Sequence, residues 1–330
     1  MSRYHRHARR HARRQAQEQG AALLAAMLTV TLVASLAAAA LWNQWRNIEV
    51  EVAERSRLQA SWVLTGALDW ARLILREDSR SGGADHLAEP WAIPLEEARL
   101  STFLSADKST TVDTDDTMLQ AFLSGGISDI QARMNVQNLV DGTKLSEPAL
   151  AAFGKLYDQL GLPPAELALV ADKLLLALDA AQASSTTSAT SATATTAPPL
   201  MPQRVNQLVW LGMSARSLEA LRPHISLLPV RTPVNLNTAS AVVLYASIPG
   251  LDMAQAQRLV SSRQLSHFRT LADAGKIVGD NKIQLSEAQF SVNSRFFEVR
   301  GRLRLDQSVV QETSVVQRDA LDVKTLWREH

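Results

Sequence analysis

An uncharged apolar run of 22 residues, Ala21–Trp42, is the feature that most constrains how this chain folds. A run of this length crosses the hydrocarbon core of a bilayer as one helix. The leader before it carries six arginines and a single acid, Glu18. Because positively charged flanks stay on the cytoplasmic side, we expect a cytoplasmic N-terminus, with about 290 residues across the membrane.

Other interpretations of the run compete with a permanent span. A secretory signal peptide is one, and Ser35–Ala40 imitates its cleavage site, but its apolar region is only about 7–15 residues long. Twin-arginine export is disfavoured, because Arg9–Arg10 and Arg13–Arg14 lack an apolar follow-on. A plain N-terminal anchor fits length and charge, but it does not account for Gly20 between leader and run.

The chain after the span has the pattern of an amphipathic helix that continues it. From residue 42 to residue 80 there is no proline, and Gly66 is the single glycine. Apolar residues alternate with charged ones at helical spacing. We expect Leu58, Trp62 and Leu68 to pack this helix onto a sheet, while its remaining face meets partners.

A glycine-ended basic leader, an apolar N-terminal helix and an amphipathic continuation together resemble the type IV pilin superfamily. The resemblance implies that a prepilin peptidase cuts between Gly20 and Ala21. Most members have a glutamate at the fifth mature residue, thought to neutralise the terminal ammonium of the subunit above, whereas this chain has Ala25. A carboxylate in lipid is costly. A subunit with no other subunit above it has no terminal ammonium to neutralise, so it does not need this glutamate. Within the superfamily, the chain resembles the minor pseudopilin K family of type II secretion systems, whose members lie at the filament tip. The resemblance is in the missing glutamate, the chain length and the GAALL junction.

The middle of the chain mixes strand and helix signals. A glycine pair between apolar runs is a hairpin signal, so Gly125–Gly126 predicts a turn between strands at Met118–Ser124 and Ile127–Val136. Helices are expected at Glu147–Leu160 and Pro164–Ala181.

The remainder contains a linker and a second group of strands. Ser184–Pro202 has no apolar period, so we expect a disordered linker. Apolar and charged residues alternate strictly over Phe297–Leu305, which predicts a strand. Val309–Arg318 and Leu321–Trp327 are expected to follow as further strands.

These elements predict an α+β fold. An N-terminal transmembrane and amphipathic long helix packs on a small antiparallel, pilin-like sheet, and a large, mostly α-helical insertion with a helix-hairpin-helix-like segment interrupts that sheet. The expected parts are the cleaved leader 1–20, the transmembrane helix 21–42, the first part of the pilin-like domain 43–140, the insertion 141–288 with its linker 184–202, and the C-terminal strands 289–330.

One segment of the insertion keeps a second function open. Asn237 is expected to cap a helix through Leu244, Pro249–Gly250 to break it, and Asp252 to cap the next helix. Helix-hairpin-helix modules are built in this way and offer backbone N–H groups to DNA phosphates. The Asp252 carboxylate would occupy those donors and repel phosphate. A single-pass anchored DNA-binding protein is therefore the alternative function, although the pseudopilin family carries a similar segment.

Catalytic and metal chemistry find little support in the sequence. Seven histidines are scattered, no hydrolase or phosphate-loop motif occurs, and there is no cysteine. Asp113, Asp115 and Asp116 are weak candidates for calcium ligands, and a solvated loop is the favoured interpretation. The family resemblance implies calcium after the second helix of the insertion, but only Asp172 and Asp179 lie near that place, so we predict no cofactor.

The resemblance implies a non-enzymatic tip subunit of the type II secretion pseudopilus, which supports protein export across the outer membrane. It would sit in the bacterial inner membrane with its C-terminal domain in the periplasm. Its partners would be the other minor pseudopilins, the major pseudopilin and the prepilin peptidase, and nucleic acid is not expected. The expected partner-binding positions on the long helix are Trp42, Ile48, Leu58, Trp62 and Leu68.

Overall fold

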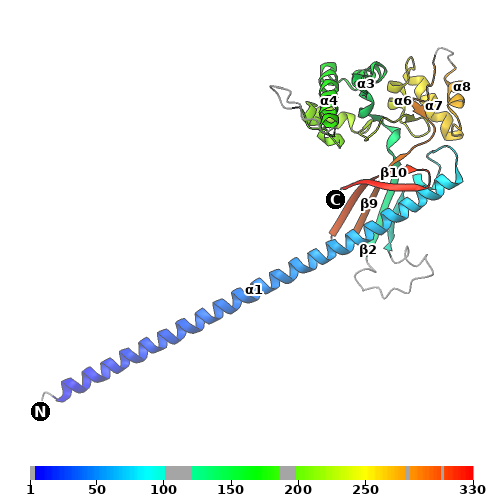
Figure 1. Ribbon diagram of the computed structural model, residues 1–330. Helices are drawn as coiled ribbons and strands as arrows, with labels where there is room; N and C mark the ends of the chain where they lie inside the picture. Colours follow the sequence, from blue (N-terminus) through cyan, green and yellow to red (C-terminus); the bar gives the residue numbers. More distant parts are fainter. Residues whose placement is uncertain (1–3, 101–120, 186–197, 280–282, 306–307, 330) are drawn as a thin grey trace. The chain divides into compact units, whose positions relative to one another are not determined.

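The computed structural model describes residues 4–100, 121–185, 198–279, 283–305 and 308–329, with side chains from residue 22 onward. The chain divides into two compact units, residues 1–62 and residues 63–330, which are described separately (Figure 1). Met118 to Gln120 and the acidic residues Asp113, Asp115 and Asp116 lie outside the described residues, as does most of the expected linker.

Helix α1 spans Tyr4–Ser81. Its part up to Trp62 forms the first unit, and the remainder belongs to the second unit. The expected continuous helix is thus confirmed, and from residue 22 onward it is long and apolar enough to cross a membrane. Leu58 and Trp62 are 63% and 76% exposed, so the prediction that they pack on the sheet is wrong. The buried stripe of the second unit begins at Leu64 and continues through Leu68. Trp62, two residues before Leu64, points to another side of the helix.

The second unit is built on a five-stranded antiparallel sheet. Its order is β1-β2-β9-β10-β11, so each strand pairs with the next one in the sheet (Figure 1). Leu68, Ala71 and Leu75 of α1 are buried against this sheet in one core with Phe297 and Val316. The strands are β1 (Leu95–Arg99), β2 (Ala121–Asp129), β9 (Phe296–Leu305), β10 (Ser308–Asp319) and β11 (Asp322–Glu329).

The predicted hairpin at Gly125–Gly126 is wrong, because β2 runs straight through both glycines. Gly125 lies opposite Gly301 and Gly126 opposite Arg300 in the ladder with β9. A Cβ on Gly125 would lie 2.3 Å from the carbonyl oxygen of Arg300. The glycine is therefore required for close approach of two backbones, the other common reason for glycine inside a strand. The three C-terminal strands are confirmed, with bounds shifted by one or two residues.

A mostly helical block lies between β2 and β9 and has its own core, which includes Tyr157, Leu174, Leu208 and Leu244. The predicted helix Glu147–Leu160 is confirmed as α3, and the second predicted helix is α4, which ends four residues late at Ser185. The block's other helices are α5 (Ala215–Leu221), α6 (Ala241–Ser247), α7 (Met253–Leu265) and α8 (Leu271–Val278).

Short strands and 3-10 turns complete the description. The two-residue strands are β3 (Met134–Asn135), β4 (Val140–Asp141), β5 (Lys144–Leu145), β6 (Ile225–Ser226), β7 (Val234–Asn235) and β8 (Phe290–Ser291). The 3-10 turns are η1 (Pro90–Ala92), η3 (Ile130–Ala132), η4 (Val136–Leu139) and η5 (Val205–Leu211).

Of the two predicted helix caps, the one of α7 is confirmed and the one of α6 is wrong. Asp252 caps α7, where its carboxylate accepts from the Gln255 N–H at 2.6 Å. The cap of α6 is Ser240, and the prediction that Asn237 caps this helix is wrong. The buried Asn237 side chain instead bonds both backbone groups of Phe268, accepting at 2.8 Å and donating at 2.9 Å. Asn237 lies four residues before the first residue of α6, Ala241, and Ser240 at the helix start accepts from the Val243 N–H instead.

Candidate functional site

An apolar groove of about 310 Å³ lies between α1 and the β1 side of the sheet. One wall is α1, with Leu64 and Trp70, and the opposite wall is the segment from Pro90 to Leu95. Gly125 and Gly301 lie at its floor, and a Cβ on Gly301 would meet Leu64 Cδ2 at 2.9 Å. The absence of a side chain on Gly301 therefore lets Leu64 of α1 approach the sheet closely.

The mouth of the groove carries exposed apolar side chains. Trp70 is 45% exposed and Ile93 is 66% exposed. At one end the buried Glu312 is held by Arg328, whose Nε donates at 2.8 Å. A groove with apolar walls and its buried charge already paired suits an apolar side chain from a partner helix.

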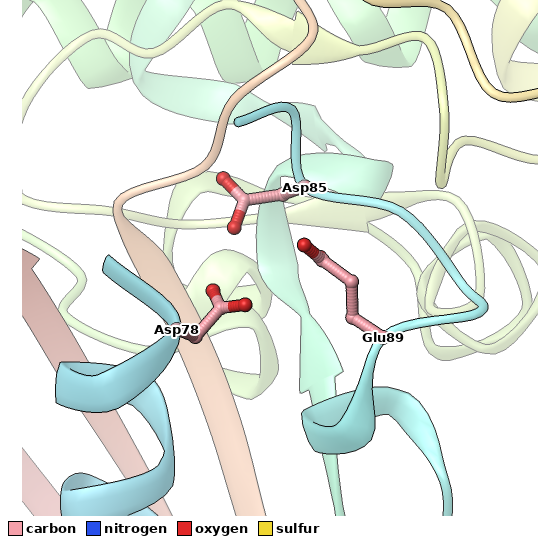
Figure 2. A group of neighbouring side chains, drawn as sticks. All are labelled: Asp78, Asp85 and Glu89. Atoms are coloured by element: carbon pink, nitrogen blue, oxygen red, sulfur yellow. The ribbon is translucent and has the colours of Figure 1, made fainter. Parts of the chain in front are cut away.

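Three carboxylates converge where α1 meets the sheet. Asp78 lies in the last turn of α1, and Asp85 and Glu89 lie in the loop that follows; their side chains point toward one another (Figure 2). The guanidinium of Arg318, on β10, donates to Asp78 at 2.6 Å and to Asp85 at 2.6 Å. Three ligand atoms within 4.8 Å of one another have the geometry of a cation site. An arginine already supplies the positive charge there.

Burial raises the pKa of two of these groups, Asp85 and Glu89. It raises the pKa of the Asp85 carboxyl, and the charge of Arg318 opposes that rise. Burial also raises the pKa of Glu89 to about 7, against hydrogen bonds from the His86 N–H and the Trp91 indole. An acid kept partly neutral near pH 7 lowers the charge density of the cluster.

A second buried carboxylate, Asp129 at the end of β2, joins the sheet to the helical block. Its Oδ2 accepts from the hydroxyls of Thr238 and Ser294, both at 2.6 Å, and from Asn235 Nδ2 at 3.1 Å. Burial raises the pKa of Asp129 to about 6. Because the backbone N–H of Ser294 also donates to Asp85 at 2.6 Å, the two carboxylate groups form one buried polar network, which we term the junction network.

The helix-hairpin-helix-like segment contains an internal cation. Nζ of Lys155, from α3, donates to the carbonyl oxygens of Tyr245, Ile248 and Leu251 at 2.6, 3.2 and 3.3 Å. Proline has no N–H, so Pro249 cannot donate to the Tyr245 carbonyl, and the lysine takes that role. The hairpin's carbonyl oxygens are thus bonded to Lys155, and one N–H of the first turn of α7, that of Gln255, is bonded to the Asp252 carboxylate. Nothing in this geometry favours DNA binding.

Replacing Lys155 with methionine is expected to lower the free energy of unfolding by about 1.5–3 kcal/mol, because the carbonyls lose a charged donor. Lys276→Met is the matched control, since the Lys276 side chain is 75% exposed and pairs with Asp273 on the surface. That control is expected to cost less than about 1 kcal/mol. Urea unfolding followed by circular dichroism measures both. Equal losses would show that Lys155 does not hold the hairpin.

The structure brings few of the expected partner-binding positions into the groove. Leu68 lines it, whereas Trp42 and Ile48 are exposed on the part of α1 in the first unit. Ala25 lies on α1 too, and of Gly20 and Ala21 only the helical backbone is described. Pro249, Gly250 and Asp252 form the hairpin as expected, with Gly250 at φ +78°.

Sequence reasoning missed the junction network and one histidine pair. The histidines are not all scattered, because the rings of His86 and His267 stack with centroids 3.8 Å apart. Arg318 is 233 residues from Asp85, and no local pattern joins them. The available signal was one basic residue, Arg318, directly after the uncharged segment Ser314–Gln317.

Comparisons with known proteins agree on one family. Two models described as type II secretion system protein K match residues 132–230 and 234–293. The type II secretion system protein K of Pseudomonas aeruginosa is 27% identical over 271 residues, which cover 78% of this chain and 73% of the relative.

A solved structure shares the fold. It is the crystal structure of the GspK-GspI-GspJ complex from the enterotoxigenic Escherichia coli type 2 secretion system, matched with a TM-score of 0.58 and 18% identity over 84% of this chain and 97% of the other. The two family matches together span almost the whole helical block. The relative, whose match covers most of the chain, has the same description. Over most of its length this chain is similar to protein K of type II secretion systems.

Proposed function

We propose that this chain is the minor pseudopilin at the tip of a type II secretion pseudopilus, where it acts without catalysis in protein export across the outer membrane. The apolar start of α1 anchors it in the inner membrane, and the domain that follows lies in the periplasm. Its similarity to protein K of type II secretion systems supports this role. The size of the helical block supports the tip position, because a subunit with such a block leaves little room for another above it.

The open groove is the observation that carries the partner interaction. The solved structure that shares the fold is a GspK-GspI-GspJ complex, and we propose that the corresponding minor pseudopilins bind here. An apolar side chain from a partner helix would enter between Trp70 and Ile93 and reach the floor at Gly125. Apolar anchors that enter a preformed groove supply most of the affinity in contacts of this kind.

Trp70→Glu and Ile93→Glu are each expected to weaken assembly with the other two minor pseudopilins by at least about tenfold, since a charge would enter an apolar contact. Leu265→Glu is the matched control, because Leu265 is 92% exposed at the end of α7, away from the groove. Co-purification of the detergent-solubilised chains, with circular dichroism to verify folding, measures the effect. Assembly that is unchanged by both groove variants would contradict the assignment of this surface.

Processing after Gly20 tests the membrane assignment independently. Gly20→Val is expected to block maturation, because a side chain would enter the peptidase position that takes glycine, and the precursor would keep its leader. Mass spectrometry of the membrane-bound protein distinguishes a chain that starts at Ala21 from an uncut one. An N-terminus near Ala39 or Leu41 would instead identify a secretory signal peptidase and contradict the pseudopilin processing.

A further inference from the structure

The central strand β9 carries three arginines on one face of the sheet. Arg300, Arg302 and Arg304 alternate with Val299, Gly301 and Leu303, which face α1, so the arginines lie on the opposite face. Successive arginines on such a strand are about 6.8 Å apart. Like charges at this spacing repel one another, so the row gains energy from an anionic partner.

The neighbouring strands do not neutralise this row. Across from the three arginines lie Gly126, Ser124 and Phe122 on β2 and Thr313, Gln311 and Val309 on β10, none of them charged. The Phe122 ring lies beneath two guanidiniums, with Arg304 at 4.2 Å and Arg99 at 6.0 Å from its centroid. Aromatic contact fixes the direction of these long side chains and lowers the entropy they lose on binding.

Two of the three arginines already meet carboxylates. Arg304 donates to Glu97 at 2.6 Å, and Arg300 pairs with Glu298. Between them Arg302 is exposed, and no acidic side chain of the described residues pairs with it. The face therefore displays carboxylate pairing at both ends and an open guanidinium in the middle.

We propose that this arginine face, made of Arg99, Arg300, Arg302, Arg304 and Phe122, binds an extended acidic segment of another polypeptide, with a carboxylate on Arg302. An extended chain repeats every two residues at the spacing of the arginines. Ser124, Gln311 and Thr313 beside the row offer hydrogen bonds to its backbone. Glu97 and Glu298 reduce the net positive charge, which disfavours a nucleic acid or lipid surface, whose binding grows with the number of unpaired cations.

The test uses the full chain in a neutral detergent and a labelled decapeptide of alternating Glu and Thr, with a Gln and Thr peptide as the probe control. Fluorescence anisotropy is expected to show binding of the Glu peptide alone, weakened as NaCl rises from about 50 to about 300 mM. Arg302→Gln is expected to weaken binding at least about fivefold, through loss of a charged hydrogen bond. Arg258→Gln, at an exposed arginine of α7, is expected to leave binding unchanged.

Several results would overturn the proposal. One is equal binding of the Gln peptide, and another is an Arg302→Gln variant that binds like the original. A third is stronger, Arg302-dependent binding of a DNA duplex or of short-chain phosphatidylglycerol. Finally, peptide binding that appears only after Asp113, Asp115 and Asp116 are changed to Asn would mean that the chain's own acids fill the face.

Discussion

Arg318→Met is expected to lower the free energy of unfolding by about 3–5 kcal/mol, the largest loss among the substitutions considered. The guanidinium is buried and donates to Asp78, Asp85 and the Ser294 carbonyl. Removing one partner of a buried ion pair leaves uncompensated charge in a poorly solvated place. Chemical unfolding of the fragment Gln44–His330 measures the loss.

The loss is expected to depend on pH. Burial already raises the pKa of Asp85, and removing Arg318 removes the charge that opposes this rise. Asp85 of the folded variant then binds a proton more tightly than in the unfolded chain, so its contribution to stability is fully present below the unfolded pKa and is lost as pH rises through the folded pKa. Arg295→Met is the control, because its pair with Asp319 is largely exposed, and it is expected to cost less than about 1 kcal/mol. A similar small loss at Arg318, with no pH dependence, would contradict the role of the junction network.

Gly125→Ala is expected to cost about 3 kcal/mol, although it adds only one methyl group. That carbon would lie 2.3 Å from the carbonyl oxygen of Arg300 and 3.4 Å from the Cα of Gly301. Both are backbone atoms of the paired strand, so relief requires β2 and β9 to separate, and overpacking against atoms that cannot rotate away is at the costly end of its range. Thermal unfolding of the same fragment, followed by circular dichroism, measures the change.

Gly66→Ala is the matched control for that substitution. Gly66 lies in α1, and nothing within 4 Å would meet its Cβ. Alanine is the better helix former, so this variant is expected to gain up to about 1 kcal/mol. If both glycine variants changed stability in the same direction and by the same amount, close approach of β2 and β9 would not be the reason for Gly125.

The parts of the fold that sequence predicts well are those that local chemistry determines. Strict alternation around Arg300 and Arg302 predicts β9, because side chains of a strand point alternately to two faces. Asp252 followed by Gln255 three residues later predicts the start of α7, and the structure has that capping box. Both patterns lie within a few residues and depend little on the rest of the chain.

The features that failed depend on partners distant in sequence. Gly125–Gly126 has the local signature of a turn, and only the carbonyl of Arg300, about 175 residues away, makes Gly125 a close-contact position inside a strand. Asn237 is a good cap by residue type, but the backbone of Phe268 takes its side chain. The groove is invisible in the sequence for the same reason, since α1, the segment at Pro90, Gly125 and Gly301 come from four separate regions.

The strand order gives the helical block a simple place in the topology. Asp129 and Phe297 are partners in the ladder between β2 and β9, and the chain leaves the sheet just after the first and returns just before the second. The sheet is therefore an up-and-down meander, and residues 130–295 are an enlarged connection between two adjacent strands. Because the ladder itself fixes the register, such a connection can lengthen or shorten during evolution without rearranging the strands, at an entropic cost that grows slowly with length.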